Sequence, residues 1–233
     1  MEIAERRGLP GLAYPEEYLK RLAAELSERF AGTFGPGTVE RYVLESYTSL
    51  LSTATVRAHL AHRVTRFASD RLTALAQAQG ALPRDVPEVL FVCEQNAGRS
   101  QLAAAMTDHL AQGRVHVRSA GSMPAAQLDP AVVQVMQEMG IDVGREFPKP
   151  LTDDVVQAAD VVVTMGCGDA CPLYPGKRYL DWELDDPQGL SIAEVRRLRD
   201  QIRVRVEELI ASLRAAEASS LRRRHARGAR TRA

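Results

Sequence analysis

The sequence predicts an α/β protein in which a four-stranded parallel sheet, with helices on both faces, follows a small all-α bundle of three helices. Past residue 87, short apolar runs alternate with longer amphipathic stretches, as strands and helices do in a parallel sheet covered on both faces. Before residue 82, apolar residues recur only with helical spacing. Because Pro83 and Pro87 interrupt both patterns, we expect domains at residues 1–82 and 87–215.

The first domain is predicted from three amphipathic stretches. Pro15 opens the first helix, the second is expected to begin near Thr38, and the third is expected to carry Val56 and to end near Gly80. No basic recognition helix follows a turn, so an interaction or packing module is favoured over a DNA-binding one. His59 and His62 share a helix face, but no third ligand has a suitable spacing, so we expect no metal site. We expect residues 87–215 to fold and act without this bundle.

In the second domain, four apolar runs are predicted to be strands. They are residues 90–92, 115–119, 159–165 and 178–180. Asp129 and Thr152 are expected to cap helices, and Ser191 with Glu194 has the pattern of a capping box.

Charge is unevenly distributed over the 233 residues. The formal net charge is zero, but the last fifteen residues hold six arginines and no acid, so we expect residues 219–233 to be a disordered basic tail with no specific nucleic-acid role. No apolar run reaches the ~20 residues of a membrane helix, and no apolar signal segment opens the chain, so a cytoplasmic location is expected. An odd count of three cysteines indicates reactive thiols rather than a disulfide framework.

The loop after the first predicted strand is the candidate active site. Apolar residues run directly into Cys93, and helix formers follow Ser100. Gly98 permits close approach of a ligand, and Asn96 tolerates a left-handed conformation. Arg99 offers a charged bidentate clamp and, with the helix N-terminus, favours a Cys93 thiolate at neutral pH. We predict a nucleophilic Cys93 inside an oxyanion site, with the Glu94 side chain directed to solvent; the site comprises Glu94, Gln95, Asn96, Ala97, Gly98, Arg99 and Ser100.

The pattern Cys-x5-Arg-Ser after a strand resembles the low-molecular-weight protein tyrosine phosphatase family, and residues 96–101 are similar to arsenate reductases built on that fold. The resemblance covers residues 87–215. A second landmark, residues 118–122, implies that Ser119 hydrogen-bonds Asn96. A third, residues 185–187, implies that Asp186 is the general acid.

Two further cysteines favour an arsenate reductase over a phosphatase. A phosphatase of this fold hydrolyses its cysteine adduct and needs no second thiol, whereas arsenate reduction takes its electrons from thiols. Cys167 and Cys171 follow the third predicted strand, whose end lies on the same side of a parallel sheet as Cys93. We expect a disulfide to pass from the Cys93–Cys167 pair to the Cys167–Cys171 pair, and the resemblance implies thioredoxin or a low-molecular-weight thiol as the final reductant.

Substrate choice is indicated by the residues that come after Asp186. Gln188 and Gly189 stand where tyrosine phosphatases of this fold usually carry an aromatic residue, which favours a small oxyanion such as arsenate. Ala104 stands where some arsenate reductases of the family carry a glutamate linked to potassium, so no potassium dependence and no cofactor are expected. A tyrosine phosphatase, a mycothiol-dependent arsenate reductase and a non-enzymatic oxyanion sensor stay open as alternatives, and the cysteine pair could instead be incidental or zinc-binding.

Overall fold

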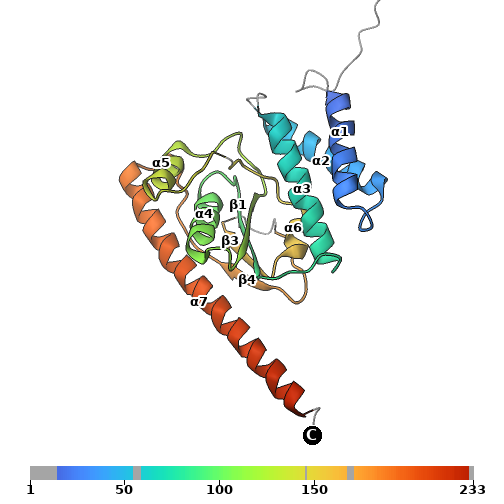
Figure 1. The fold of residues 1–233 in the computed structure, drawn as a ribbon. Coiled ribbons are helices and arrows are strands. Elements are labelled where there is room, and N and C mark those ends of the chain that lie inside the picture. Colours follow the sequence, from blue (N-terminus) through green and yellow to red (C-terminus); the bar gives the residue numbers. More distant parts are fainter. Residues whose placement is uncertain (1–14, 55–58, 145, 167–170, 231–233) are drawn as a thin grey trace, which may run out of the picture.

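The computed structural model describes residues 15–54, 59–144, 146–166 and 171–230, with side chains described as far as Ser219. Seven helices and four strands occur in these ranges (Figure 1). Their order is α1 (Pro15–Arg29), α2 (Pro36–Thr53), α3 (Leu60–Ala78), β1 (Glu88–Cys93), α4 (Arg99–Ala111), β2 (His116–Gly121), α5 (Pro130–Glu138), α6 (Asp153–Ala158), β3 (Val161–Met165), β4 (Arg178–Asp181) and α7 (Ile192–Arg230). The predicted fold class is therefore confirmed.

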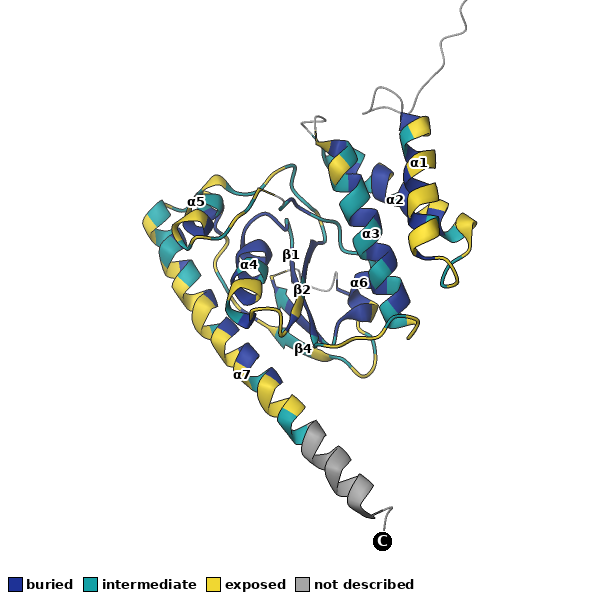
Figure 2. Cartoon of the chain, in the orientation of Figure 1, coloured by how far each residue is buried: buried dark blue, intermediate teal, exposed yellow. Residues whose placement is uncertain are grey.

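The four strands form one parallel sheet in the order β2-β1-β3-β4. Strand β1 is central and buried at every position, which explains its unbroken apolar run (Figure 2). Its last residue, Cys93, lies in register with Gly121 of β2 and Met165 of β3. The loops that follow β1, β2 and β3 consequently meet at one edge of the sheet.

Side chains of β1 alternate between two apolar clusters on opposite faces of the sheet. Val89, Phe91 and Cys93 pack in the cluster that contains the buried residues of α4, α5 and α7. Leu90 and Val92 pack in the cluster that contains the buried residues of α6. The sheet is thus covered on both faces, as Figure 1 shows with α4 and α7 on one side and α6 on the other.

Helix α3 belongs to two cores at once. Val64, Phe67 and Leu72 lie in a cluster with residues of α1 and α2, which is the core of the expected three-helix bundle. Ala74, also in α3 and fully buried, lies instead in the cluster with Leu90 of the sheet. The bundle is therefore attached to the α6 side of the sheet through α3 rather than standing apart from it (Figure 1).

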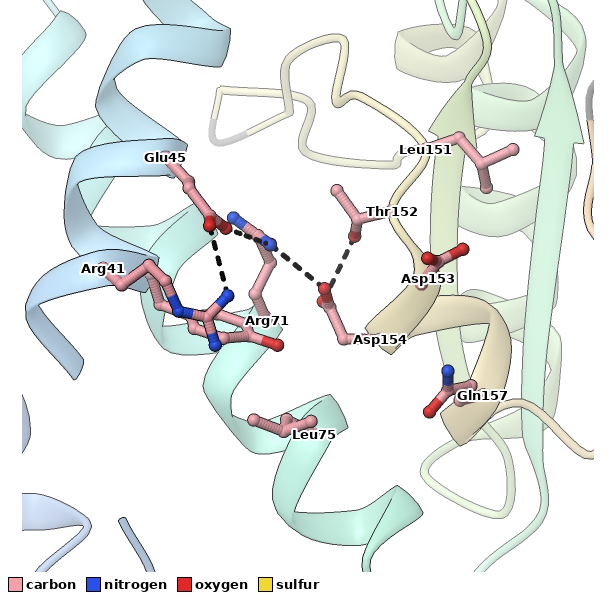
Figure 3. Close-up of a pocket in the computed structure, with 10 residues that line it drawn as sticks. Arg41, Glu45, Arg71, Leu75, Leu151, Thr152, Asp153, Asp154 and Gln157 are labelled. Carbon is pink, nitrogen blue, oxygen red and sulfur yellow. Dashed lines mark hydrogen bonds and ion pairs between the residues drawn. The ribbon is translucent and has the colours of Figure 1, made fainter. Parts of the chain in front are cut away.

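A buried arginine of α3 links this bundle to α6. Arg71 contacts Asp154 through Nη2 and Oδ1 at 3.2 Å, and Glu45 of α2 through Nη2 and Oε2 at 3.1 Å. Its guanidinium also lies 4.5 Å from the centre of the Tyr42 ring. These residues line a pocket of about 430 Å³ between α2, α3 and α6 (Figure 3). The guanidinium of Arg71 therefore holds three helices together.

Arg118 of β2 makes a second link. It pairs through Nε with Glu88 of β1, donates through Nη1 to the carbonyl of Asp70 at 2.9 Å, and donates through Nη2 to Gln77 at 3.1 Å. Asp70 and Gln77 both belong to α3. Burial alone would raise the pKa of Glu88, but His116 and Arg118 together lower it, so this buried carboxylate is held ionised.

The three predicted helix caps differ in the hydrogen bonds that they make. Asp129 accepts from the N–H groups of Ala131 at 2.8 Å and Val132 at 3.1 Å, as expected. The capping box also forms, since Glu194 accepts from the Ser191 N–H at 2.8 Å. Thr152 occupies the N-cap position of α6 as predicted, but its side chain accepts no N–H group; its hydroxyl donates to the Asp154 side chain at 3.1 Å.

The expected disordered tail is corrected, because α7 continues as a helix to Arg230. Residues 219–230 contain no proline and hold five arginines, which are good helix formers, although Gly228 is a poor one. Extending an existing helix through such residues is far easier than nucleating a new one. Over the described ranges, none of the helices, α7 included, combines the length and apolar character needed to cross a membrane.

Candidate active site

Cys93 lies at the end of the central strand, where a loop of five residues leads into α4. Its side chain is almost completely buried, and Sγ has two polar neighbours. The Asn96 N–H donates to Sγ at 3.2 Å, and the Ser100 hydroxyl lies 2.9 Å from Sγ. Cys93 lines a pocket of about 170 Å³ together with Gly98, Arg99 and Asp186. The sulfur is thus presented to a small polar pocket.

Most carbonyls of the loop are hydrogen-bonded to the segment that follows β2. N–H groups from residues 122–129 donate to the carbonyls of Cys93, Glu94, Gln95 and Ala97, at distances from 2.8 to 3.3 Å. Within the described part of the chain, the N–H groups of Gln95, Ala97 and Gly98 have no hydrogen-bond acceptor. The loop therefore has donors to offer to an anion over Cys93.

Asn96 adopts the left-handed conformation that the sequence predicted, with φ at 48°. Its side chain is fully buried and satisfied: Nδ2 donates to Ser100 Oγ at 2.8 Å, while Oδ1 accepts from Gln101 Nε2 at 3.0 Å and from the Lys149 N–H at 2.8 Å. Ser119 is buried nearby but is not among these partners, so the expected Ser119–Asn96 hydrogen bond is wrong.

The turn after β2 supports the loop through its glycine instead. A Cβ at Gly121 would lie 2.6 Å from the Glu94 carbonyl oxygen and 2.8 Å from the Asn96 nitrogen, both of them backbone atoms. Only glycine allows so close an approach without displacing the loop. The sequence motif pointed to this turn correctly, but to the wrong residue within it.

Arg99 reaches across the pocket to the loop that follows β4. Its Nη2 contacts Asp186 Oδ2 at 2.7 Å, and its Nη1 donates to the Leu184 carbonyl at 3.4 Å. The other Asp186 oxygen accepts from the Gln188 N–H at 3.0 Å, which fixes the carboxylate. Asp185 lines a different pocket, of about 560 Å³, with Trp182 and Glu183. Of the two aspartates, only Asp186 lines the pocket of Cys93.

The pocket has a roof that the sequence did not predict. Gly98 lacks a side chain where a Cβ would collide with the ring of Pro187. Gln95 donates to Gln188 Oε1 at 3.2 Å, which ties the two loops together. Gly98 therefore makes room for Pro187, which lines the pocket together with Gln95 and Gln188.

The side chain of Cys171 is less exposed to solvent than a thiol in a mobile loop would be. It is 8% exposed and packs in the cluster that contains Leu90 and Val92, on the sheet face opposite to the side chain of Cys93. Cys167 falls in residues 167–170, outside the described residues. Cys93 is not in a disulfide.

Two further expectations concern residues outside the pocket. His59 and His62 lie at the start of α3, and among described side chains no three His, Cys, Asp or Glu residues come together as a metal site. Ala104 lines a pocket of about 480 Å³ behind the loop, which Lys149 and Glu146 also line. Lys149 Nζ contacts Glu146 Oε2 there at 3.1 Å.

A buried cysteine at the end of a central parallel strand, facing unpaired loop N–H groups, an arginine and an aspartate, defines a class of enzymes that act on tetrahedral oxyanions through a thiolate. The family model for low molecular weight phosphotyrosine protein phosphatases matches residues 88–219, and the chain belongs to this family. A separate model, for the N-terminal domain of protein-tyrosine-phosphatase-like proteins, matches residues 19–76.

Several relatives are named as arsenate reductases. A glutaredoxin arsenate reductase of Synechocystis is 34% identical over 129 residues, which are 54% of this chain and 98% of the relative. Arsenate reductase 1 of Staphylococcus epidermidis is 32% identical over 123 residues, which are 51% of this chain and 92% of the relative. Among solved structures, a thioredoxin-dependent arsenate reductase of Corynebacterium glutamicum is 47% identical with a TM-score of 0.78, covering 86% of this chain and 98% of that one.

Proposed function

We propose that the protein is an arsenate reductase in which Cys93 is the nucleophile and a thioredoxin is the final reductant. One observation carries the proposal: Cys93, Arg99 and Asp186 line the same small pocket, beneath loop N–H groups that have no acceptor among the described residues. The names of the relatives supply the substrate, and the Corynebacterium structure supplies the reductant. Because the electrons come from thiols, we also propose a reducing compartment, the cytoplasm.

The first step forms a bond between Cys93 Sγ and arsenic. Asp186 protonates the departing oxygen, which leaves as water. Arg99 and the N–H groups of Gln95, Ala97 and Gly98 stabilise the negative charge on the remaining oxygens. The roof made by Pro187 and by the Gln95–Gln188 contact suits a small inorganic anion better than a phosphotyrosine ring.

The second step transfers the electrons. The Cys167 thiolate attacks Cys93 Sγ, so that a sulfur–sulfur bond forms, the sulfur–arsenic bond breaks, and its electron pair leaves with arsenic as arsenite. Cys171 then attacks Cys167 and frees Cys93 as a thiol. Because Cys171 starts in an apolar cluster on the other face of the sheet, this exchange requires its side chain to leave that cluster. A dithiol of thioredoxin finally reduces the Cys167–Cys171 bridge.

The test is steady-state arsenate reduction with thioredoxin and its reductase, compared with mycothiol and other low-molecular-weight thiols. We expect turnover with thioredoxin and none in Cys93→Ser, since a serine hydroxyl supplies almost no anion at neutral pH. Turnover with mycothiol alone would favour the mycothiol-dependent alternative. Efficient phosphotyrosine hydrolysis without arsenite release would favour a phosphatase, and anion binding without any turnover would favour a sensor.

A further inference from the structure

The segment at residues 146–149 is anchored in the helical bundle, although it belongs to the chain beyond β2. Phe147 is 2% exposed and lies in the apolar cluster of α1, α2 and α3. The guanidinium of Arg63 in α3 lies 5.6 Å from the centre of its ring. Next to it, Glu146 Oε1 contacts Arg66 Nη2 of α3 at 3.0 Å. The apolar cluster of the three helices, together with Arg63 and Arg66 of α3, therefore fixes this segment.

The same segment holds the oxyanion loop. Gln101 Nε2 donates to the Phe147 carbonyl at 2.9 Å and to Asn96 Oδ1 at 3.0 Å. The Lys149 N–H donates to the same Asn96 oxygen at 2.8 Å. Gln101 and Asn96 are both buried, so water does not replace these contacts readily.

Asn96 connects the segment at residues 146–149 to the sulfur of Cys93 through hydrogen bonds. Its N–H contacts Cys93 Sγ, and its Nδ2 binds the Ser100 hydroxyl that also contacts Sγ. Asparagine tolerates its left-handed conformation, and the hydrogen bonds from Gln101 and the Lys149 N–H hold the side chain in place. A shift of Asn96 would move both polar neighbours of the sulfur and the loop N–H groups beside it.

We propose that the helical bundle positions the oxyanion loop, acting through Phe147, Gln101 and Asn96. Phe147 and Gln101 are positioning residues, since neither lines the pocket of Cys93. The inference rests on the proposal that Cys93 and its loop bind an oxyanion. It gives the bundle a role in catalysis that is distinct from covering the sheet.

The experiment measures oxyanion affinity without turnover. Inorganic phosphate bound over Cys93 should protect the thiol from alkylation by iodoacetamide, and peptide-resolved mass spectrometry of the full-length chain gives the phosphate concentration that halves the alkylation rate. Each variant serves as its own reference, so changes in thiol reactivity cancel. The variants are Phe147→Ala, which removes the anchor, and Gln101→Leu, which removes the bridge but leaves the bundle intact. The matched control is Leu26→Ala, a truncation in the same apolar cluster but on α1, the helix farthest from the sheet (Figure 1).

We expect the half-protecting phosphate concentration to rise at least fivefold in Phe147→Ala and Gln101→Leu, and to stay within twofold of the wild type in Leu26→Ala, although that control melts at a lower temperature. Phe147→Leu keeps an apolar anchor and should restore most of the affinity. Should Phe147→Ala fail to fold, Gln101→Leu and Phe147→Leu decide the matter.

Unchanged affinity in a folded Gln101→Leu protein overturns the proposal, as does an equal loss of affinity in Leu26→Ala. Phosphate protection with no arsenate reduction in the wild type would refute the reductase alone, whereas no protection in the wild type would refute the oxyanion site and this inference with it.

Discussion

Single residues of the loop could be predicted where their chemistry is local. The left-handed conformation of Asn96 follows from its residue type and place, and the gathering of Cys93 with Arg99 follows from a strand, a loop and a helix in succession. Ser119 could not be resolved from Gly121 in this way, because both stand at the end of β2. The distance from Gly121 to the Glu94 carbonyl, which decides between them, is a property of the assembled sheet.

Gly121→Ala is expected to damage the site more than its small size implies. The added methyl group would meet two backbone atoms of the oxyanion loop, which cannot rotate away as a side chain can. We expect a loss of about 1 to 3 kcal/mol of stability and at least a tenfold loss of arsenate reduction. Urea unfolding and steady-state kinetics measure the two effects. Gly37→Ala is the matched control, since nothing lies within 4 Å of a Cβ there, and an equal loss in that variant would contradict the steric explanation.

Asp186→Asn should slow the first chemical step while leaving the fold intact. Loss of a general acid typically costs ~100-fold to 10,000-fold, and the single amide oxygen of asparagine can still accept a hydrogen bond from either Arg99 or the Gln188 N–H. Rapid-quench measurement of the first turnover isolates this step. Asp185→Asn serves as the control and should be mild, because Asp185 does not line the pocket of Cys93. The reverse ranking of the two variants would reassign the acid.

At the scale of elements, the alternation of strands and helices predicted the sheet, because the two inner strands, β1 and β3, are buried along almost their whole length and helices pack on both faces. The contacts that place the loop were beyond prediction, since Lys149 and Phe147 reach Asn96 and Gln101 from about fifty residues away with no repeating pattern. Residue type likewise predicted the position of Thr152 at the start of α6, but not the direction of its hydroxyl, which donates to Asp154 and accepts no helix N–H.

The proposed order of thiol exchange can be tested with single substitutions of Cys167 and Cys171. With one equivalent of arsenate and no added thiol, Cys171→Ser should release one arsenite per enzyme and retain a bridge between Cys93 and Cys167. Cys167→Ser should release little arsenite, because Cys171 begins on the opposite face of the sheet. Peptide mapping under non-reducing conditions identifies the bridge. A Cys93–Cys171 bridge that forms in Cys167→Ser at the wild-type rate would reverse the order.

At the scale of the whole molecule, the bundle and the sheet share α3, so the expectation that residues 87–215 act alone is revised. Deletion of residues 1–82 would uncover the side of the sheet where Ala74 packs, and would remove the partners of Phe147 and Arg118. We expect the truncated protein to lose cooperative thermal unfolding and arsenate reduction. Deletion of residues 219–233 is the control and should change neither. A truncated protein with wild-type activity would show that the bundle is dispensable.

Low pH should weaken the ionic contacts between the helical bundle and the sheet domain. Burial alone would raise the pKa of Glu146, but Lys149 and Arg66 outweigh it and hold the pKa below its ordinary value of 4.5; Glu88 behaves likewise with His116 and Arg118. A lowered folded pKa contributes stability that is fully present above pH 4.5 and is lost as the pH falls through the folded value. Asp70 acts in the opposite direction, because burial raises its pKa, but it is one group against two.

We therefore expect the free energy of unfolding to decline steeply below pH 4.5, and to decline less steeply in Glu146→Gln, which has no carboxylate to protonate at this position. Urea unfolding between pH 3 and 6 measures both slopes. Parallel slopes for the two proteins would show that Glu146 carries none of the acid sensitivity.

The position of Phe147 in the bundle core also limits the order in which parts of the chain can fold during synthesis on the ribosome. The three helices are synthesised first, yet their core contains a ring that emerges some seventy residues after α3 ends, when β1 and β2 have already been made. Until then the nascent bundle exposes both the gap for Phe147 and the face of α3 that packs on the sheet. Long-range contacts of this kind slow folding and leave apolar surface open while they form. Synthesis paused before residue 147 should accordingly yield a bundle that chaperones retain, and release should follow once that residue has cleared the exit tunnel.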